Sequence, residues 1–416
     1  MRAGCVIVGG GHGGFHTANA LREAGFTAPI TIVDAGAGLP YARPPLSKDY
    51  LAGTVGAEQI WFRPESFYAA AGVTLLAGTT VEAVDRATRC VRLVDAEGTV
   101  SLLDYDHLVL ATGSRPRPLT VPGAELAGVH RLATRADADR LATAFERARD
   151  VVIIGAGFIG LECAAHATAR GLAPTVINAA ARVLERAASA PFAAQIEAWH
   201  EARGVRMLHG TVAREIVGAD GAATGVRDSA GRLHPADLVV VGIGAEPVSE
   251  LAQAAGLVVQ GGVLVDALLR TSDPGIFAIG DCARYPHAAT GALLRLESVQ
   301  NATDQARSVA ATLTGRPRPY DAAPWFWSDQ AELRIQIAGL SAAADEHVLR
   351  GDPASGRFSV YCFRDGVLVG VDSLGSAADH IGARKLLAAR VSPTPEQAAN
   401  PSFPLNSLLQ LAPVGG

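Results

Sequence analysis

The sequence predicts an α/β protein in which two parallel sheets, each covered by helices, are followed by a small α+β domain at the C-terminus. The first observation is a repeat, because a buried apolar run leads into glycines and then a helical pattern at Cys5–Gly25 and again at Val151–Gly171. The second is a change at about Tyr320 to the alternating pattern that is typical of antiparallel strands. The third is the length of 416 residues, which suits about two to four domains.

The first repeat has the elements of a strand–helix–strand unit. Val6–Val8 predicts a strand, and a glycine-rich turn separates it from a helix over Phe15–Ala24, which Gly25 ends. Ile30–Val33 predicts the second strand, and Leu108–Leu110 a further buried strand. Parallel strands joined by a helix are therefore expected here.

The second repeat follows the same order. Val151–Ile154 predicts a strand, a helix follows and extends to Arg170, and Thr175–Ile177 predicts the next strand. Leu238–Val241 is a further buried apolar run. The two repeats thus predict two βαβ units of the kind found in Rossmann-like domains.

The remaining elements complete the first domain and form the third. Gly275–Ile279 predicts a strand and Val299–Leu313 a helix. In the C-terminal region, Phe358–Phe363 and Val367–Val371 have the period of two that antiparallel strands show, and Ala377–Arg390 predicts a helix. Pro401–Pro404 is expected to be irregular.

Two proline- and glycine-rich segments mark where the chain passes between domains, Arg115–Pro118 and Gly242–Pro247. We therefore expect a discontinuous domain formed by residues 1–115 and 247–318. Residues 116–246 form a second domain in this prediction, and residues 319–416 form the third.

Composition excludes several classes of protein. No run of about 18 uncharged apolar residues occurs, so we expect no membrane association, and an early strand leaves no room for a signal peptide, which predicts a cytoplasmic location. The net charge of −5 disfavours nucleic acid as a partner. The five cysteines form no CxxC or metal-like pair, so we expect neither a metal site nor a redox dithiol. A monomer or a weak homodimer is expected.

The first glycine-rich turn has the spacing of a dinucleotide-binding fingerprint. Gly9, Gly11 and Gly14 follow a strand and open a helix, so the backbone and the helix N-terminus are suited to hold a pyrophosphate. Asp34 follows the second strand, 20 residues after Gly14, where an acid typically accepts a hydrogen bond from a ribose hydroxyl.

The second turn repeats this spacing at Gly155, Gly157 and Gly160. Asn178 occupies the position of the acid. An acid there favours NADH by repelling a 2′-phosphate, whereas Asn still bonds the hydroxyl but repels phosphate less, so NADH is expected and NADPH stays possible. Arg182 is either a contact for that phosphate or a solvated surface residue.

Two dinucleotide folds in one chain indicate a flavin site and a nicotinamide site. Asp281 follows the strand at Gly275–Ile279 directly, in the sequence Gly280-Asp281. A carboxylate at this strand end is suited to accept hydrogen bonds from the ribityl chain of a flavin. FAD is therefore assigned to the first fold and NAD(P)H to the second.

With these features the chain resembles the oxygenase-coupled NADH-dependent ferredoxin reductases, which are putidaredoxin reductase-like FAD-dependent pyridine nucleotide oxidoreductases. Rubredoxin reductases and apoptosis-inducing factor are more distant relatives. The resemblance extends from about Val6 to Leu408. It is carried by the two fingerprints, the Asp281 motif and three further segments, which are Leu39–Lys48, Arg295–Asn301 and Pro324–Gln330.

The resemblance implies roles for individual residues. Lys48 is expected near flavin N5 and paired with Glu162, and an ammonium there would stabilise the negative charge of the reduced flavin. Arg43 is implied as an FAD contact. Trp325 and Trp327 resemble an aromatic cover of the flavin and a route toward an iron–sulfur partner. The other residues expected to contact the two cofactors are Gly13, Ala35, Val81, Ala111, Thr112, Gly113, Gly244 and Val299.

This chain departs from the family at Ala133, where relatives often have an FAD-contacting arginine, so Arg131 or Arg135 is a candidate substitute. The resemblance implies an enzyme that passes electrons from NADH through FAD to a [2Fe–2S] ferredoxin of a monooxygenase or dioxygenase. The alternatives are an NADH oxidase or small-molecule reductase of the same fold, and a redox-sensing flavoprotein like apoptosis-inducing factor. A scaffold with vestigial nucleotide folds fits two intact fingerprints poorly.

Overall fold

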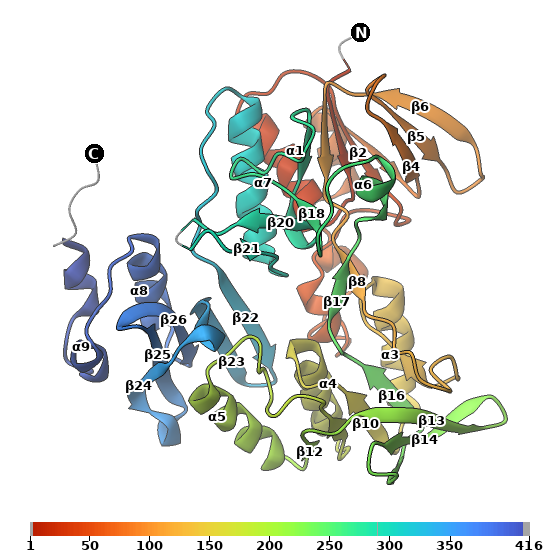
Figure 1. Ribbon diagram of the computed structural model, residues 1–416. Helices are drawn as coiled ribbons and strands as arrows, with labels where there is room; N and C mark the ends of the chain where they lie inside the picture. The colour runs from red at the N-terminus through yellow and green to blue at the C-terminus, as the bar shows by residue number, and fades with distance from the viewer. Residues whose placement is uncertain (1–2, 289, 411–416) are drawn as a thin grey trace. The chain divides into compact units, whose positions relative to one another are not determined.

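The computed structural model describes residues 3–288 and 290–410, which fall into two compact units (Figure 1). Unit 1 consists of Met1–Arg43, Gly56–Arg115 and Ala245–Ala322. Unit 2 consists of Pro44–Val55, Pro116–Gly244 and Ala323–Gly416. The chain therefore passes between the units several times, and the three-domain division with its exact boundaries stays a prediction.

Unit 1 is built on a five-stranded parallel sheet in the order β19-β7-β1-β2-β3. Every residue of β1 is buried, and Ile7 has no exposed surface, which is expected of a central strand covered on both faces. Burying one such side chain stabilises the fold by about 1.5–3 kcal/mol. The five strands are β1 (Cys5–Val8), β2 (Ile30–Asp34), β3 (Val73–Ala77), β7 (His107–Leu110) and β19 (Ile276–Ala278).

Two helices, α1 and α7, pack against each other in unit 1 (Figure 1). Phe15 and Leu21 of α1, together with Val309 of α7, belong to one apolar core with the parallel sheet. The helices of this unit are α1 (His12–Glu23), α2 (Glu65–Ala70), α6 (Glu250–Ala254) and α7 (Val299–Leu313), with 3-10 turns η2 (Ala57–Ile60) and η3 (Gly280–Cys282).

The rest of unit 1 consists of small sheets. An antiparallel sheet has the order β4-β5-β6, another small sheet has the order β18-β20-β21, and β8 pairs with β17. Their bounds are β4 (Thr80–Asp85), β5 (Cys90–Val94), β6 (Val100–Asp104), β8 (Ser114–Pro116), β17 (Ala245–Pro247), β18 (Val263–Leu264), β20 (Ala283–Pro286) and β21 (Leu293–Leu294).

Unit 2 contains a second five-stranded parallel sheet, in the order β12-β11-β10-β16-β9. Helix α4 packs against its central strands (Figure 1), and a three-stranded antiparallel sheet, β13-β14-β15, adjoins it. The elements are β9 (Val129–His130), α3 (Arg135–Arg147), β10 (Val151–Ile154), α4 (Phe158–Ala169), β11 (Thr175–Ile177), α5 (Ala190–Glu201), β12 (Arg206–Leu208), β13 (Ala213–Ala219), β14 (Ala222–Asp228), β15 (Leu233–Pro235) and β16 (Leu238–Val241).

The C-terminal part of unit 2 is an antiparallel sheet in the order β22-β23-β26-β25-β24, on which α8 packs (Figure 1). Ile335 and Phe358 of this sheet share an apolar core with Phe192 and Leu161 of the second parallel sheet's helices. The elements are β22 (Trp325–Gln330), β23 (Leu333–Gly339), β24 (Glu346–Asp352), β25 (Arg357–Arg364), β26 (Val367–Leu374), α8 (Ala377–Ala388) and α9 (Pro395–Ala399), with 3-10 turns η1 (Pro44–Ser47), η4 (Ser341–Ala343), η5 (Pro353–Ser355) and η6 (Leu405–Gln410).

The predicted elements are confirmed with small shifts at their ends. The strands at Val151–Ile154, Thr175–Ile177 and Leu238–Val241 and the helix at Val299–Leu313 have the predicted bounds. The first helix begins at His12 rather than Phe15, because the glycines of the turn are already helical. The fold class, α/β with two Rossmann-like parallel sheets and a small C-terminal α+β part, is confirmed. Within the described part of the chain, no helix has the length and apolar character needed to cross a membrane.

Candidate functional site

The first glycine turn joins β1 to α1 with very little space between them. Gly9 has a φ of +105°, in the region that favours glycine. A Cβ atom on Gly14 would collide with the carbonyl oxygen of Gly9, whereas a Cβ on Gly11 would have no atom within 4 Å. The turn therefore packs tightly at its first and last glycines and leaves its backbone accessible at the middle one, as a pyrophosphate cradle requires.

Asp34 ends β2 directly beside this turn. A Cβ atom on Gly10 would come within 2.5 Å of Asp34 Oδ2, and one on Gly36 within 3.3 Å of the same oxygen. The carboxylate therefore lies against the glycine turn, where an acid can accept a hydrogen bond from a ribose hydroxyl. Ala35 follows it in the chain and contributes no polar side chain.

The carboxyl ends of β7 and β19 meet at the same edge of the first sheet as the turn. The carbonyl of Ala111 lies against Gly9, and the Thr112 hydroxyl donates to the Val248 carbonyl at 2.6 Å. Ser114 donates to Asp281 Oδ2 at 2.8 Å. Open parallel sheets bind ligands at this edge.

Asp281 is an acid of this region whose pKa is shifted by its surroundings. Burial raises the pKa of Asp281 to about 6, opposed by the hydrogen bond from Ser114 and by the positive charges of Arg43 and Arg295. The guanidinium of Arg295 also donates to the Asp281 carbonyl at 3.1 Å. At His12 the direction is opposite. Burial, together with the charges of His16 and Arg43, lowers the pKa of His12 to about 3, so the ring is neutral.

Four other predicted contacts are spread over unit 1. Val81 is buried in β4. Val299 is the first residue of α7, whose N-cap Ser298 accepts from the Asn301 N–H. Backbone N–H groups at such a helix start lack intrahelical partners and can donate to a ligand. Gly13 lies within α1, and Gly113 follows the end of β7 at Leu110.

The second glycine turn reproduces the first in unit 2. Gly155 has a φ of +106°, and a Cβ on Gly160 would collide with the Gly155 carbonyl oxygen. Gly157 is the N-cap of α4, and a Cβ on it would have no atom within 4 Å. Gly244 follows β16 with a φ of +98°. Two turns with the same packing thus support two separate dinucleotide-binding sites.

Asn178 follows β11 and begins a loop that contacts the second glycine turn. The contact is a hydrogen bond of 3.0 Å from the Leu184 N–H to the Ala156 carbonyl. Asn178 is buried, and its Nδ2 lies within hydrogen-bond distance of the Arg182 carbonyl and of His209. The guanidinium of Arg182 is turned into its own loop. It donates to the carbonyls of Val183, Glu185 and Ala188.

The predicted pairing of Lys48 with Glu162 is present within unit 2. Lys48 Nζ lies 2.8 Å from Glu162 Oε1, and only 15% of the Lys48 side chain and 3% of the Glu162 side chain are exposed. The hydroxyl of Ser328 donates to Glu162 Oε1 at 2.6 Å, and the hydroxyl of Ser47 donates to Oε2. The Glu162 carboxylate is therefore held by three donors, which suits an ion pair that keeps a fixed position.

A series of hydrogen bonds among buried polar side chains leads to the Glu162 carboxylate. The His200 Nε2 lies 2.8 Å from Gln330 Oε1, and Gln330 Nε2 donates to the Ser328 hydroxyl at 3.2 Å. His200, Gln330 and Ser328 have no exposed surface. Burial lowers the pKa of His200, so it acts as a neutral donor. The chain thus joins α5 and β22 to Glu162.

Strand β22 presents different chemistry on its two faces. Ser328 and Gln330 lie on one face, and Trp325 and Trp327 on the other, because side chains alternate along a strand. The centroids of the two tryptophan rings are 5.4 Å apart, and the guanidinium of Arg384 lies 4.3 Å from the Trp325 ring centroid. The two tryptophans were predicted from the sequence as functional residues, whereas Ser47, His200, Ser328 and Gln330 were not. The alternation within Pro324–Gln330 was the signal that would have found the last two.

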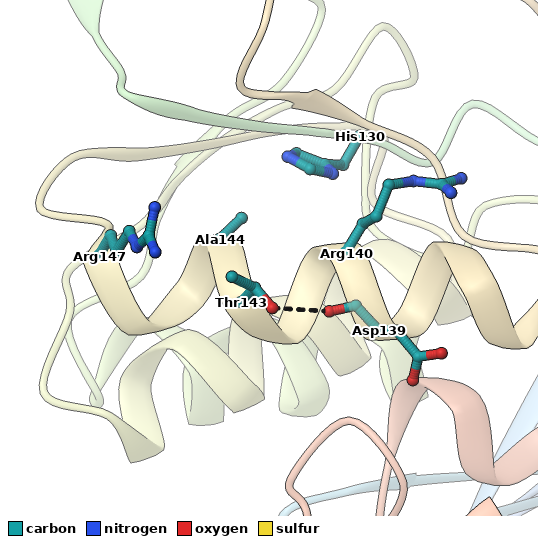
Figure 2. Close-up of a pocket in the computed structure, with 6 residues that line it drawn as sticks. All are labelled: His130, Asp139, Arg140, Thr143, Ala144 and Arg147. Carbon is teal, nitrogen blue, oxygen red and sulfur yellow. Dashed lines mark hydrogen bonds between the residues drawn. The ribbon is translucent and has the colours of Figure 1, made fainter.

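A shallow hollow of about 450 Å³ also occurs on unit 2 (Figure 2). Figure 2 shows that α3 provides most of its lining side chains and that the Thr143 hydroxyl donates to the Asp139 carbonyl. His130 belongs to β9, the edge strand, whereas the glycine turn follows the central strand β10. The hollow is therefore separate from the dinucleotide fingerprint. Its lining consists of His130, Asp139, Arg140, Thr143, Ala144 and Arg147.

The fold and these residues together define a dinucleotide-binding oxidoreductase with two nucleotide sites. Comparison with known proteins agrees. The chain belongs to the family described as pyridine nucleotide-disulphide oxidoreductase, whose model matches residues 3–306, and the model described as reductase C-terminal matches residues 325–409. The family resemblance and the oxidoreductase class predicted from the sequence are thereby confirmed.

Individual relatives cover nearly the whole chain. Rhodocoxin reductase of Rhodococcus erythropolis is 47% identical over 400 residues, which are 96% of this chain and 93% of the relative. Putidaredoxin reductase CamA of Pseudomonas putida is 39% identical over 412 residues, 98% and 97% of the two chains. The ferredoxin reductase for the CYP199A2 system from Rhodopseudomonas palustris superposes with a TM-score of 0.94 at 44% identity, covering 99% of this chain and 100% of that one. The covalent putidaredoxin reductase–putidaredoxin complex gives 0.93 at 38% identity, covering 99% of each chain. These likenesses support a flavin and a pyridine nucleotide in general terms.

Proposed function

We propose that this chain is an FAD-dependent ferredoxin reductase that takes electrons from NADH and passes them to a [2Fe–2S] ferredoxin serving a monooxygenase or dioxygenase. The observation that carries the proposal is the pair of matching glycine turns, each at the carboxyl edge of its own parallel sheet. The buried Lys48–Glu162 ion pair adds a charged group of the type that flavin chemistry uses. Each of the two parallel-sheet folds would hold one of the two cofactors.

The first turn fits FAD because its backbone is open at Gly11, where a pyrophosphate would lie, and because Asp34 lies beside it, where it would accept from a ribose hydroxyl. The chemistry that FAD would supply at this site is acceptance of a hydride from a nicotinamide and release of the two electrons one at a time. Asp281 would accept hydrogen bonds from the ribityl hydroxyls, and the N-terminus of α7 at Val299 would donate to the flavin ring. The full set proposed for FAD is Gly9, Gly11, Gly13, Gly14, Asp34, Ala35, Arg43, Lys48, Val81, Ala111, Thr112, Gly113, Asp281, Val299 and Trp325.

The second turn fits NADH in the same way. The open backbone at Gly157 and the N-terminus of α4 would hold its pyrophosphate. The residues proposed for this nucleotide are Gly155, Gly157, Gly160, Glu162, Asn178, Arg182 and Gly244. Arg182 would act by shaping its loop, because its guanidinium already donates to three carbonyls of that loop.

Lys48 and Glu162 would not transfer the hydride themselves. The Lys48 ammonium would stabilise negative charge on the reduced flavin, and Glu162 would hold the ammonium in place. A preoriented charge lowers the cost of charge development, because the surroundings need no reorganisation when the electrons arrive.

The proposed partner is supported by relatives, since one solved relative is the covalent complex of putidaredoxin reductase with putidaredoxin. Trp325 and Trp327 are proposed to take part in electron transfer toward such a partner. A cytoplasmic location and a monomeric or weakly dimeric state stay predictions. Arg131 and Arg135 stay candidates for the arginine that Ala133 lacks.

The test is an anaerobic reaction in three steps with the purified protein. Its absorption spectrum should show bound FAD, NADH should bleach that spectrum, and addition of a [2Fe–2S] ferredoxin should restore it with reduction of the cluster. Rapid turnover with oxygen alone and none with ferredoxins would favour the NADH oxidase alternative. A long-lived reduced complex that no ferredoxin reoxidises would favour a redox sensor.

A further inference from the structure

We propose that Gln305 is a positioning residue for the flavin, which holds η3, the turn that carries Asp281, against α7 so that two flavin contacts keep a fixed relation to each other. These contacts are the Asp281 carboxylate for the ribityl chain and the Val299 N–H for the flavin ring. The inference rests on the proposed function, because it concerns the proposed FAD site of unit 1. It assigns a role to a residue outside both the glycine fingerprint and the Asp281 motif.

A buried hydrogen bond joins Gln305 to η3. The Gly280 N–H donates to Gln305 Oε1 at 2.7 Å, and Gln305 has no exposed surface. A backbone N–H can only donate, so the amide atom that faces Gly280 is the oxygen. Gly280 is the first residue of η3 and Asp281 is the second. The bond therefore acts one residue away from the carboxylate.

The same residue of η3 packs against the first turns of α7. Gly280 has a φ of +70°, in the region that favours glycine, and a Cβ atom on it would lie 3.4 Å from the Cβ of Ala302. Ala302 stands one turn after Val299 and one turn before Gln305 along α7. A displacement of η3 relative to α7 would therefore change the distance between Asp281 and the helix N-terminus.

Asp281 has two further attachments, and neither joins it to α7. Ser114 donates to its Oδ2 at 2.8 Å, and Arg295 donates to its carbonyl at 3.1 Å. Ser114 belongs to β8, and Arg295 lies between β21 and α7. Within the described part of the chain, the bond from Gly280 to Gln305 is thus the hydrogen bond that ties this turn to α7.

Gln305 adds little to the stability of the fold beyond this bond. Its Nε2 is buried and has no acceptor among the described residues. Met is unbranched and of similar length, so Gln305→Met removes one hydrogen bond and also removes a buried donor that has no partner. These two effects on stability oppose each other. A loss of flavin binding in this variant would therefore report the position of η3 rather than a failure to fold.

The relation between η3 and α7 should matter most for the reduced flavin. Backbone N–H groups at a helix N-terminus favour negative charge, and negative charge develops on a flavin ring when it is reduced. If η3 shifts relative to α7, the ribityl contact and the ring contact are no longer made together. Both forms of the flavin should then bind more weakly, and the reduced form should lose more.

The experiment measures the dissociation constant of FAD and the midpoint potential of the bound flavin. In Gln305→Met we expect the dissociation constant of oxidised FAD to rise about tenfold and that of reduced FAD about 100-fold. The tenfold difference between the two forms lowers a two-electron midpoint potential by about 30 mV. The thermal unfolding midpoint of the FAD-free variant should stay within about 3 °C of the wild type.

Two further substitutions at this position test the oxygen itself. Gln305→Asn withdraws the amide oxygen from Gly280 by one methylene and should show the same two changes, so it carries the test if Gln305→Met fails to fold. Gln305→Glu at about pH 6, where a buried carboxyl group is neutral, keeps an acceptor and should bind FAD within about threefold of the wild type. Ser308→Ala is the matched control on α7, because the Ser308 hydroxyl donates to the Arg318 carbonyl rather than to η3. It should leave both values unchanged.

Wild-type binding of FAD by both Gln305→Met and Gln305→Asn would overturn the proposal. Weaker binding with an unchanged midpoint potential would overturn it too, because a structural role alone weakens both forms of the flavin equally. If the Gln305 variants behave as expected but no ferredoxin reoxidises the reduced protein, the proposed function fails and this inference stands. If a ferredoxin is reduced and the variants match the wild type, the reverse holds. A wild type that binds no FAD would refute both.

Discussion

Lys48 and Glu162 form a largely buried ion pair, with Nζ of the lysine 2.8 Å from Oε1 of the glutamate. Burying an ion pair costs solvation, which is offset only when additional hydrogen bonds satisfy the charged groups. Here Ser47 and Ser328 donate to the carboxylate, and the Pro44 carbonyl lies 3.3 Å from the ammonium. The pair is therefore held in one geometry before any substrate binds, which is the property that electrostatic stabilisation of a reaction requires.

Removing the charge of either partner should slow flavin reduction. Glu162→Gln and Lys48→Met should each lower the rate by about 10- to 1,000-fold, because the reduced flavin loses a fixed positive charge or that charge loses its position. The measurement is anaerobic stopped-flow reduction of the flavin by NADH. Glu332→Gln, on an exposed surface pair with Arg203, is the control and should react like the wild type. Wild-type rates in both charge variants would contradict the assigned role.

The polar chain behind Glu162 should contribute to stability. Gln330→Leu leaves His200 Nε2 and the Ser328 oxygen without their partner in a buried place, which costs about 1–3 kcal/mol for each group. The free energy of unfolding from urea denaturation should fall by about 2–6 kcal/mol. Asp329→Asn, the neighbour on the opposite face of β22, should change it by less than about 0.5 kcal/mol. Equal effects of the two substitutions would argue against the chain.

The fold was largely predictable because its strands are short, apolar and fully buried, as in Val151–Ile154, and because glycines mark the turns that follow them. The ends of elements were less predictable. Helix α1 begins at His12, within the glycines, because a helix that approaches a strand this closely requires residues without a Cβ at its start. Which segments pack together, such as Pro44–Val55 with the second parallel sheet's unit, is a long-range property that local patterns do not contain.

A side chain at the last glycine of the second fingerprint should weaken nucleotide binding strongly without removing the flavin. A Cβ atom on Gly160 would collide with the Gly155 carbonyl, so Gly160→Ala must displace α4 from β10. We expect binding of ADP-ribose to weaken by about 100-fold or more, with FAD still bound in unit 1. Calorimetry and the flavin spectrum give the two readouts.

Gly56→Ala is the matched control for that substitution, since its Cβ would lie no closer than 3.7 Å to another atom and its φ of −88° suits any residue. It should bind ADP-ribose as the wild type does. Tight binding of ADP-ribose by Gly160→Ala would show that this turn does not hold the nucleotide.

Asp281 should give the FAD-free protein a distinct dependence on pH. Its folded-state pKa is raised from 3.8 to about 6 by burial, so the folded protein holds this proton more tightly than the unfolded chain does. The folded state therefore loses stability as pH rises from about 4 to about 6, by at most about 3 kcal/mol. Asp281→Asn keeps an acceptor for Ser114 and should remove this loss, so its advantage in urea unfolding should grow between those pH values. Parallel stability curves for the two proteins would exclude the raised pKa.

The candidate site was predictable where a motif carries it and less so elsewhere. The spacing of the fingerprints and the Lys48–Glu162 pairing came from recurring sequence patterns. His200, Gln330 and His209 were not found, because a histidine or a glutamine inside an apolar region has no local signal that tells which distant side chain it contacts. Asn178 was found by its position, but its contact with His209 exists only in the tertiary structure.

The most direct test of the account is an anaerobic mixture of the purified protein with NADH and then with an oxidised [2Fe–2S] ferredoxin, followed by absorption. We expect NADH to bleach the spectrum of the bound FAD, and the ferredoxin to restore it while its own cluster becomes reduced. A protein that binds no flavin, or whose flavin stays oxidised with NADH, would contradict it.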